Sequence, residues 1–346
     1  MIVLRDSEDE AALRSALHQL FAKYQGNGPN PAGTSADRAA LWAQLIEMGV
    51  LAMAAPDSSG DHATLTQLCV VAEEAGANLL SAGLVEHLTV ARFLGTADFE
   101  VAHDIVSQSV SATIALRPSQ AGCWPTVPIS ATPSLVVGVH HDALGVLRLS
   151  ATPAGARALG PLQVCDVPVD ENRFVRLGPA AQLQILLDHW RVLSAAYLIG
   201  ASDVVLARTV AYVGDRHQFG RPVGAYQAVQ HGLADLPGML SGARLLVGKA
   251  AWSVDCPELQ PANDLARNDI TDPEVLASMA LLFASDMANS VADRAIHYHG
   301  AIGAAAETGI HHFYRLVRSL PLLLGPISSQ RRRLADLLVG PAWNFH

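Results

Sequence analysis

The spacing of apolar residues divides the chain into a helical part, a β part and a second helical part. Up to about Leu94, apolar side chains recur every three or four residues, as they do on the buried face of a helix. From about Val110 to Leu177 the apolar runs are short and are separated by proline and glycine, which is typical of strands. After Ala180 the helical spacing returns. We therefore predict domains at residues 1–107, 108–178 and 179–346.

These predictions depend on a small number of runs. The helical groups of the first part are Leu13, Leu17, Leu20 and Phe21; Leu41, Trp42, Leu45, Ile46 and Met48; and Leu68, Val70, Val71 and Ala75. The strand-like runs are Ala112–Leu116, Leu135–Val139, Leu144–Leu149 and Val164–Val169. The sequence thus predicts a mainly α protein with a small β domain.

The last part reads as a four-helix bundle. A polar turn, Arg216–Asp235, separates its first two helices, because Gly220 and Pro222 interrupt the apolar pattern and proline cannot continue a helix. A third helix is expected from about Pro273 to Tyr298, since proline and acidic side chains suit a first turn. The last helix is expected from about Ser328 to Leu338.

Composition excludes several classes of protein. The formal net charge of -9, without a basic stripe, argues against nucleic-acid binding. The four cysteines lie far apart and form no Cys-x-x-Cys pair, which argues against a zinc site or a disulfide framework. An acidic N-terminus argues against a secretory signal, and no run approaches the roughly 20 uninterrupted apolar residues of a membrane span. We expect a cytoplasmic protein that acts away from membranes.

The turn Arg216-His217-Gln218-Phe219-Gly220 is the most informative motif. Arg216 by itself could simply close a helix C-terminus, where it complements the dipole. Together with its neighbours, however, the turn resembles the signature of the acyl-CoA dehydrogenase family. That resemblance implies an N-terminal helical domain, a middle barrel-like β domain and a C-terminal four-helix bundle. It also implies that Arg216, Gln218, Phe219 and Gln227 reach the pyrophosphate and adenine end of a neighbouring subunit's FAD.

A second segment, Arg294–Gly303, is similar to the family's glycine-rich stretch beside the ADP half of the flavin. His297 stands where the family has glutamine, Gly300 is kept, and Ala301 replaces a second glycine. The resemblance therefore assigns His297 and Gly300 to FAD.

A metal is an alternative explanation for the histidines of this region. The candidates are His297, His299, Glu307, His311 and His312. Histidines two apart on a helix do not face each other, whereas a metal needs three or four convergent ligands. We expect no metal here, and the resemblance instead pairs Glu307 with Arg315.

Both places where the family carries its catalytic glutamate are occupied by other residues. One place holds Leu324, in a register fixed by Gly325, Gln330 and Arg331, and the other holds Trp190. Neither side chain can accept the α-proton of an acyl thioester. The resemblance keeps Asp188 and Arg191 as substrate contacts. Asp188 could be a substitute base, but it lies about 200° around the helix from Trp190.

The middle domain departs from the family in the same direction. The segment Leu116–Gly122 keeps Pro118 but lacks the polar residues that hold the flavin ring. The chain therefore resembles the shorter, glutamate-lacking subunit of actinobacterial steroid side-chain dehydrogenases. In that case a catalytic partner subunit would share FAD with it in a two-plus-two tetramer, oxidise an acyl-CoA and pass electrons to an acceptor.

Two alternatives stay open. One is a self-sufficient homotetrameric flavoenzyme with an unrecognised base, and the other is a flavin-free helical scaffold or binding protein. Leu323 and Leu324 predict an apolar plug at the reaction site. An open channel beside them would count against the inert-subunit hypothesis.

Overall fold

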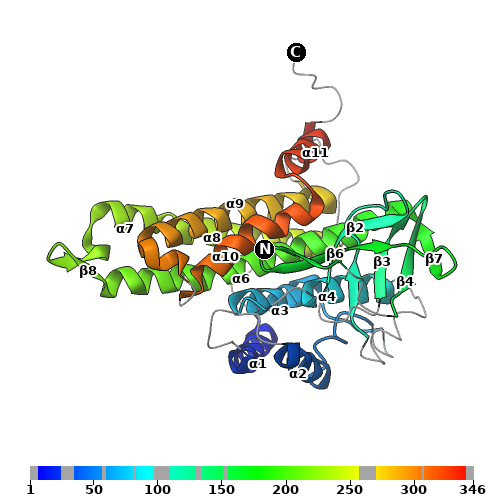
Figure 1. Ribbon diagram of the computed structural model, residues 1–346, viewed down its shortest axis with the longest axis horizontal. Coiled ribbons are helices and arrows are strands. Elements are labelled where there is room, and N and C mark those ends of the chain that lie inside the picture. Colours follow the sequence, from blue (N-terminus) through cyan, green and yellow to red (C-terminus); the bar gives the residue numbers. More distant parts are fainter. Residues whose placement is uncertain are drawn as a thin grey trace, which may run out of the picture.

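The computed structural model describes residues 7–24, 35–56, 60–80, 83–96, 110–129, 135–150, 155–256, 270–305 and 308–339. The β strands lie at one end of an elongated helical body, and a small hairpin projects from the other end (Figure 1). The mainly α fold class with a small β domain, predicted from the sequence, is confirmed.

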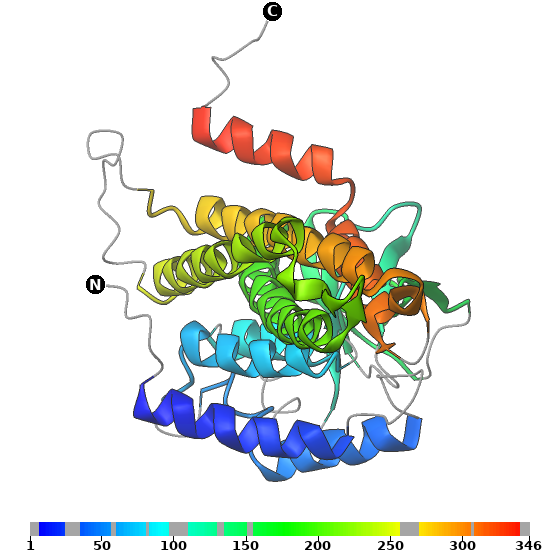
Figure 2. The ribbon, with the colours of Figure 1, turned by 90° about the vertical axis from the view of Figure 1, so that its left-hand side faces the viewer.

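The N-terminal helices form one side of the body. They are α1 (Glu8–Tyr24), α2 (Ser35–Glu47), α3 (Leu65–Ala77) and α4 (Leu84–Thr96). The start of α3 is fixed by a capping box, in which Thr64 and Gln67 exchange side-chain and backbone hydrogen bonds. Nearly every residue of α3 is buried, because α3 lies between α1 and the long helix α6 (Figure 2).

Two small sheets make up the middle of the chain. One has the strand order β1-β3-β4-β7 and the other β2-β6-β5. A second core between them contains Trp124, Val127, Val136, Leu147 and Val167. The strands are β1 (Ala112–Ile114), β2 (Cys123–Pro128), β3 (Leu135–His140), β4 (Ala143–Arg148), β5 (Arg157–Leu159), β6 (Leu162–Pro168) and β7 (Phe174–Pro179).

The C-terminal part is a helical bundle built on α6. Its elements are η1 (Ala180–Gln182), α6 (Leu183–Asp215), β8 (His217–Gln218), β9 (Arg221–Pro222), η2 (Val223–Ala225), α7 (Gln227–Ala234), α8 (Leu236–Asp255), α9 (Pro273–His299), η5 (Gly300–Ala304), α10 (Ile310–Ser319), η7 (Leu320–Leu324) and α11 (Ile327–Val339). The apolar cores of the N-terminal helices and the bundle are continuous.

One helix of the bundle differs from the prediction. The helix predicted from about Ser328 to Leu338 is present as α11, but it lies on the outside and has no buried residue (Figure 2). The helix that packs on α9 and α6 is α10, which buries Ile310, Phe313, Leu316 and Val317. Its arginines are exposed and its histidines are half-buried, and these polar residues masked the helical pattern in the sequence.

Glycine allows α3 and α6 to approach backbone to backbone. A Cβ on Gly76 would lie 2.0 Å from the carbonyl oxygen of Tyr197, and a Cβ on Gly200 would lie 1.9 Å from that of Glu73. Any side chain at either position would force the two helices apart.

Two helical stretches, Ala180–Asp215 and Pro273–Ala304, are long and apolar enough to cross a membrane by length and composition. Their apolar windows are 78% and 72% buried within the protein. They are therefore the core helices of the bundle, and their hydropathy is explained by packing.

Candidate functional site

The polar turn after α6 forms a hairpin at the end of the molecule opposite the sheets (Figure 1). Arg216 is the C-cap residue of α6 and has an extended backbone. Between β8 and β9, Phe219 and Gly220 have φ angles of +52° and +82°. Two consecutive positive φ angles are typical of a two-residue turn that follows the natural twist of a hairpin. This geometry leaves the Phe219 side chain at the tip, 94% exposed.

Arg216 is held in place by an aromatic pair. Its Nη1 donates to the Tyr212 hydroxyl at 2.7 Å. The Tyr212 ring in turn stacks on His299, with centroids 4.2 Å apart and planes 15° apart. His299 is in the last turn of α9, so this stack joins the end of α6 to the end of α9.

The stack brings both FAD-assigned segments to the same end of the bundle. His297 is exposed in the last turn of α9, and Gly300 caps that helix with a φ of +62°. A Cβ on Gly300 would meet nothing within 4 Å, so the positive φ, rather than crowding, explains the glycine. Gln218 and Gln227 are exposed, one on β8 and the other at the first residue of α7.

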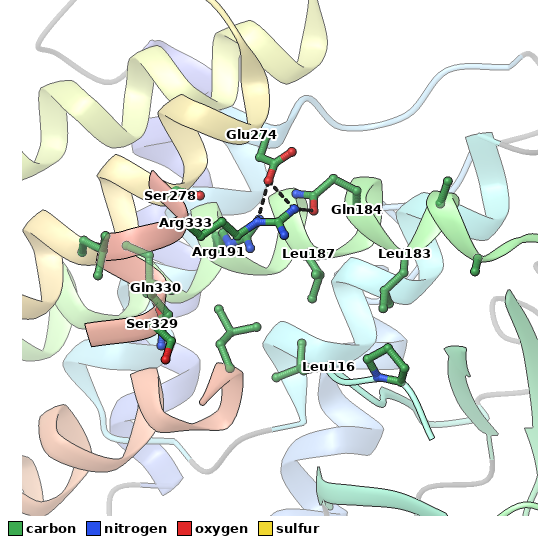
Figure 3. Close-up of a pocket in the computed structure, with 16 residues that line it drawn as sticks. Leu116, Leu183, Gln184, Leu187, Arg191, Glu274, Ser278, Ser329, Gln330 and Arg333 are labelled. Carbon is green, nitrogen blue, oxygen red and sulfur yellow. Dashed lines mark hydrogen bonds and ion pairs between the residues drawn. The ribbon is translucent and has the colours of Figure 1, made fainter. Parts of the chain in front are cut away.

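A pocket of about 610 Å³ lies at the other end of the bundle, between α6, α9, α11 and the sheet domain (Figure 3). Part of its wall is apolar and part is polar. The apolar part includes Leu116, Leu187, Leu281, Leu282 and Leu324, and the polar part includes Gln184, Arg191, Glu274, Gln330 and Arg333.

The polar groups of this wall form a connected network. Arg333 donates to Glu274 at 2.8 Å and to the side-chain oxygen of Gln184 at 3.0 Å (Figure 3). Gln184 then donates to Asp188 at 2.6 Å, and the same Asp188 oxygen accepts from Arg191 at 2.8 Å. The two predicted substrate residues, Asp188 and Arg191, are thus partners in a buried ion pair.

Burial acts on both members of that pair. It raises the pKa of Asp188 to about 6, against the opposing effects of Arg191 and Gln184. It also lowers the pKa of Arg191 from its ordinary value, although Asp188 works in the other direction. Taking charge out of water disfavours the ionised form of each group, and the ion pair offsets part of that cost.

Comparison with known proteins shows which fold and which proteins the chain is similar to. Residues 179–339 match the family model described as "Acyl-CoA dehydrogenase, C-terminal domain". Over 346 aligned positions the chain is 28% identical to acyl-CoA dehydrogenase IpdE2 of Mycobacterium tuberculosis, covering 96% of this chain and 99% of that protein. Residues 179–339 thus match the C-terminal domain of the acyl-CoA dehydrogenase family, and the chain as a whole is similar to a protein of that name.

Two solved structures share the fold of this chain over nearly the full length of both proteins. The ChsE4–ChsE5 complex from Mycobacterium tuberculosis matches with a TM-score of 0.77 and 21% identity, covering 98% of this chain and 100% of that chain. A variant of the Tcur3481–Tcur3483 steroid ACAD matches with a TM-score of 0.79 and 22% identity, covering 96% and 98%.

Leu324 and Trp190, which the sequence resemblance puts at the two places of the catalytic glutamate, have different surroundings. Leu324 lines the pocket. Trp190 is fully buried on another side of α6, where its Nε1 donates to Glu86 on α4 at 3.1 Å. The other oxygen of Glu86 accepts from the backbone of Gly83 at 2.7 Å. Trp190 therefore joins the bundle to the N-terminal helices.

The expected apolar plug is only partly present. Leu323 is 1% exposed and belongs to the main core, whereas Leu324 borders the open pocket. Among the described residues that line this pocket, Glu274 is the one carboxylate, and Arg333 neutralises it. The pocket therefore has room for a ligand but no carboxylate free to take a proton.

The segment that replaces the family's flavin cradle is bound within its own domain. Arg117 donates to the Thr126 hydroxyl at 2.8 Å, and the Ser119 hydroxyl lies 2.8 Å from His140 Nδ1. The side chains of Arg117 and Ser119 are thus already engaged with neighbouring strands.

The histidines considered for a metal are differently placed. His299 is turned inward on Tyr212, its Nδ1 is 2.8 Å from the carbonyl oxygen of Ala295, and His297 is exposed. Glu307 lies outside the described residues, so its predicted partnership with Arg315 remains a prediction. Within the described ranges, the group of metal-type ligands that does converge is His140, His141 and Glu171, which the sequence did not suggest.

Proposed function

We propose that this chain is a non-catalytic subunit of a heteromeric, FAD-dependent acyl-CoA dehydrogenase in the cytoplasm. A catalytic partner supplies the base and the cradle for the flavin ring. This chain completes the adenosine and pyrophosphate side of the partner's FAD. The assembly oxidises the α,β bond of an acyl-CoA and passes the electrons to a separate acceptor.

The observation that carries this proposal is the state of the pocket beside Leu324. Dehydrogenation needs a carboxylate that can remove the α-proton while the β-hydrogen leaves as hydride. The pocket's described lining offers Glu274, held 2.6 Å from Arg333. Trp190 occupies the second base position and is committed to Glu86. Trp190 has no basic group, and Glu274 is already paired with a cation.

The groups suited to FAD are divided between the two ends of the chain. At the hairpin end, Arg216 is an oriented guanidinium, and Tyr212 uses one of its five N–H donors. The remaining donors suit a pyrophosphate, and the exposed Phe219 ring suits an adenine face. At the sheet end, Ser119 is tied to His140, and the loop does not fit the flavin ring. When bound, FAD would supply the hydride acceptor.

Asp188 and Arg191 are proposed as groups that position the acyl thioester. Arg191 borders the pocket, and Asp188 lies behind it in the ion pair. A buried guanidinium held at 2.8 Å by one carboxylate has a fixed direction, so it can orient a carbonyl or phosphate oxygen of a ligand.

The names of the fold neighbours support a paired assembly. One is a complex of two differently named chains, ChsE4 and ChsE5, and another is described as a steroid ACAD with two named components. We extend both features to this chain as part of the proposal: a two-plus-two tetramer with a catalytic acyl-CoA dehydrogenase, and a bulky, steroid-type acyl group.

A self-sufficient flavoenzyme is the second candidate, and two observations favour it. The pocket beside Leu324 is open, and the Asp188 pKa of about 6 is close to the value of a general base. Asp188→Asn distinguishes the two. In a self-sufficient enzyme it removes activity of the chain alone by a factor of about 10²–10⁴. In the paired assembly the chain alone has no activity to lose.

The deciding experiment measures the visible flavin spectrum and the dehydrogenase activity of the chain purified alone. The same measurements are then made after co-expression with the acyl-CoA dehydrogenase encoded beside it. We expect a colourless, inactive chain alone, and a yellow, active complex with fewer than one flavin per chain. A yellow and active lone chain would overturn the proposal. If the complex carrying Arg216→Ala held as much flavin as the unaltered complex, a flavin-free scaffold would be favoured instead.

A further inference from the structure

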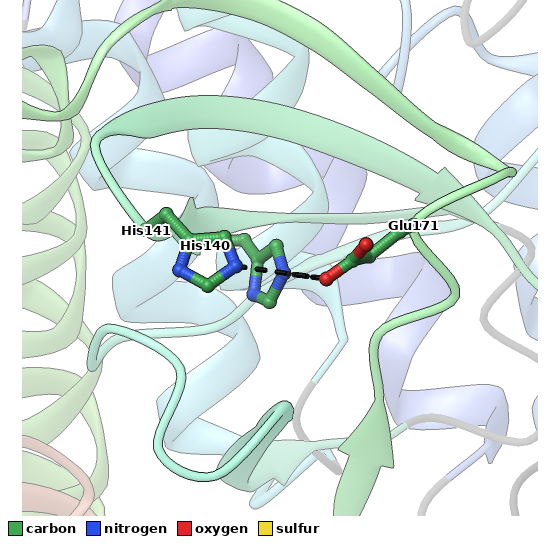
Figure 4. A group of neighbouring side chains, drawn as sticks. All are labelled: His140, His141 and Glu171. Atoms are coloured by element: carbon green, nitrogen blue, oxygen red, sulfur yellow. Dashed lines mark ion pairs between the residues drawn. The ribbon is translucent and has the colours of Figure 1, made fainter.

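Three metal-type side chains meet on the sheet domain, far from the hairpin that carries Arg216 (Figures 1 and 4). His140 is the last residue of β3, and His141 follows it in the turn to β4. Glu171 comes from the turn between β6 and β7. The candidate ligand atoms of the three residues all lie within 4.8 Å of one another.

His140 supplies a buried nitrogen that lacks a partner. Its ring is 5% exposed, and its Nδ1 lies 2.8 Å from the Ser119 hydroxyl. Its Nε2 is buried and has no hydrogen bond. Buried polar atoms are nearly always satisfied, so such a nitrogen calls for water or an ion. If Nδ1–H donates to Ser119, Nε2 presents a lone pair, which is the arrangement of a metal-binding histidine with a second-shell partner.

The distances are close to those of a metal centre. His140 Nε2 is 3.7 Å from Glu171 Oε1, and His141 Nε2 is 3.6 Å from the same oxygen. Zinc bonds of about 2.0–2.1 Å in a tetrahedron place neighbouring ligand atoms about 3.3 Å apart. Small rotations of the exposed His141 and Glu171 side chains would close the difference.

The backbone explains why two consecutive histidines share one face. Successive side chains of a strand point to opposite faces. His141 escapes this alternation because it lies in a turn with a φ of +52°, and the two rings are only 4.0 Å apart. Phe174 lies edge-on to the His140 ring at 5.6 Å and helps to fix its plane. The buried ligand is therefore preorganised.

We propose that His140, His141 and Glu171 bind a divalent transition metal of the zinc class, with solvent completing the coordination. Two imidazoles and a carboxylate are borderline ligands that suit this class better than magnesium or calcium. The ion links the β3–β4 turn to the β6–β7 turn and, through Ser119, to the loop Leu116–Gly122. The site is structural and independent of the proposed FAD contacts.

The test is calorimetric titration of zinc chloride into the full-length chain after treatment with chelator, together with the visible absorption of the cobalt(II) form. We expect one ion per chain, a cobalt spectrum with nitrogen ligands, and a rise in melting temperature with zinc. Glu171→Gln and His141→Ala should each weaken zinc by at least about tenfold. Their side chains are 76% and 72% exposed, so both variants should fold.

The matched control is His62→Ala, which removes an exposed histidine outside the cluster and should leave the titration unchanged. Absence of zinc heat and of a cobalt band in the unaltered chain would overturn the proposal. So would equal zinc affinity in Glu171→Gln and the unaltered chain, because the ion would then bind elsewhere. None of these outcomes depends on flavin or on the partner subunit.

Discussion

The two ends of the helical bundle differ in what they expose. At the hairpin end, Phe219 is 94% exposed, and Arg216 donates to Tyr212, whose ring stacks on His299. At the pocket end, the charged groups bind one another: Glu274 with Arg333, and Asp188 with Arg191. One end leaves an aromatic ring uncovered, and the other has satisfied its charges internally.

This difference indicates that a chain can lose its proton acceptor and still keep the groups that contact a partner. A proton acceptor works only when it is free, so pairing or replacing it ends catalysis without harming the fold. An exposed aromatic and an oriented arginine contribute little to the chain's own stability and have a use only when something docks on them. Their presence at the end of the bundle opposite that pocket favours the proposed supporting role.

The largest expected effect is on stability, at Trp190. Trp190→Ala should lower the free energy of unfolding by about 3–5 kcal/mol, because it opens a cavity and removes the donor to the buried Glu86. Urea unfolding of the chain measures it. Trp190→Phe keeps most of the packing and should cost less. If Trp190→Ala instead altered the activity of the complex with unchanged stability, the pocket end would be functional.

The second effect concerns pH and the buried His87, the neighbour of Glu86 on α4. Burial lowers the pKa of His87 to about 4, so the folded chain resists a proton that the unfolded chain takes up near pH 6.5. Stability from this group is complete above pH 6.5 and is lost as pH falls towards 4, by roughly 3 kcal/mol.

Melting temperature as a function of pH measures this loss. His87 Nδ1 accepts from the backbone of Ala112 at 3.3 Å, so protonation also breaks a link between α4 and β1. His87→Gln should flatten the profile between pH 6.5 and 4 at some cost in stability at neutral pH. An equally steep profile in His87→Gln would assign the acid sensitivity to another group, such as His189, whose pKa is also lowered by burial.

The third effect tests the hairpin end. Arg216→Ala should weaken flavin retention of the complex by about 10–100-fold, the usual cost of losing a hydrogen bond to a charged group. Flavin bound per complex after dialysis measures it. Arg208→Ala is the control, because Arg208 is exposed on the same helix two turns earlier. If both variants lost the same amount of flavin, the loss of a positive charge would explain the effect, and a direct contact from Arg216 would not.

The smallest effect is expected at Phe219. Phe219→Ala should leave the melting temperature of the lone chain unchanged, since the ring is 94% exposed. In the complex it should weaken flavin or partner binding by about 0.5–1.5 kcal/mol, a typical aromatic contribution. A drop in the lone chain's melting temperature would mean that the ring packs within its own chain.

The hairpin end was predictable from the sequence because its information is local. Arg216, Gly220 and Pro222 lie within seven residues and determine a turn by their own conformational limits. The helices α1, α3, α6 and α9 were predictable for the same reason, since each repeats an apolar face. Strands β2 and β7 were not, because proline at Pro125 and exposed positions in β7 obscure their pattern.

The pocket network and the histidine cluster could not be predicted, because their partners are distant in sequence. Arg333 meets Glu274 across 59 positions and Gln184 across 149. Glu171 reaches His140 only after three further strands, β4, β5 and β6. Single-sequence patterns indicate faces and turns, whereas such encounters are set by how the elements pack.

The close approach at Gly76 and Gly200 determines how this protein can be divided. Because α3 and α6 touch main chain to main chain, the N-terminal helices and the bundle share one continuous core. A fragment beginning at α6 would bare Leu198 and Ile199, which are fully covered in the whole chain. Truncation to the bundle alone should therefore give an insoluble product.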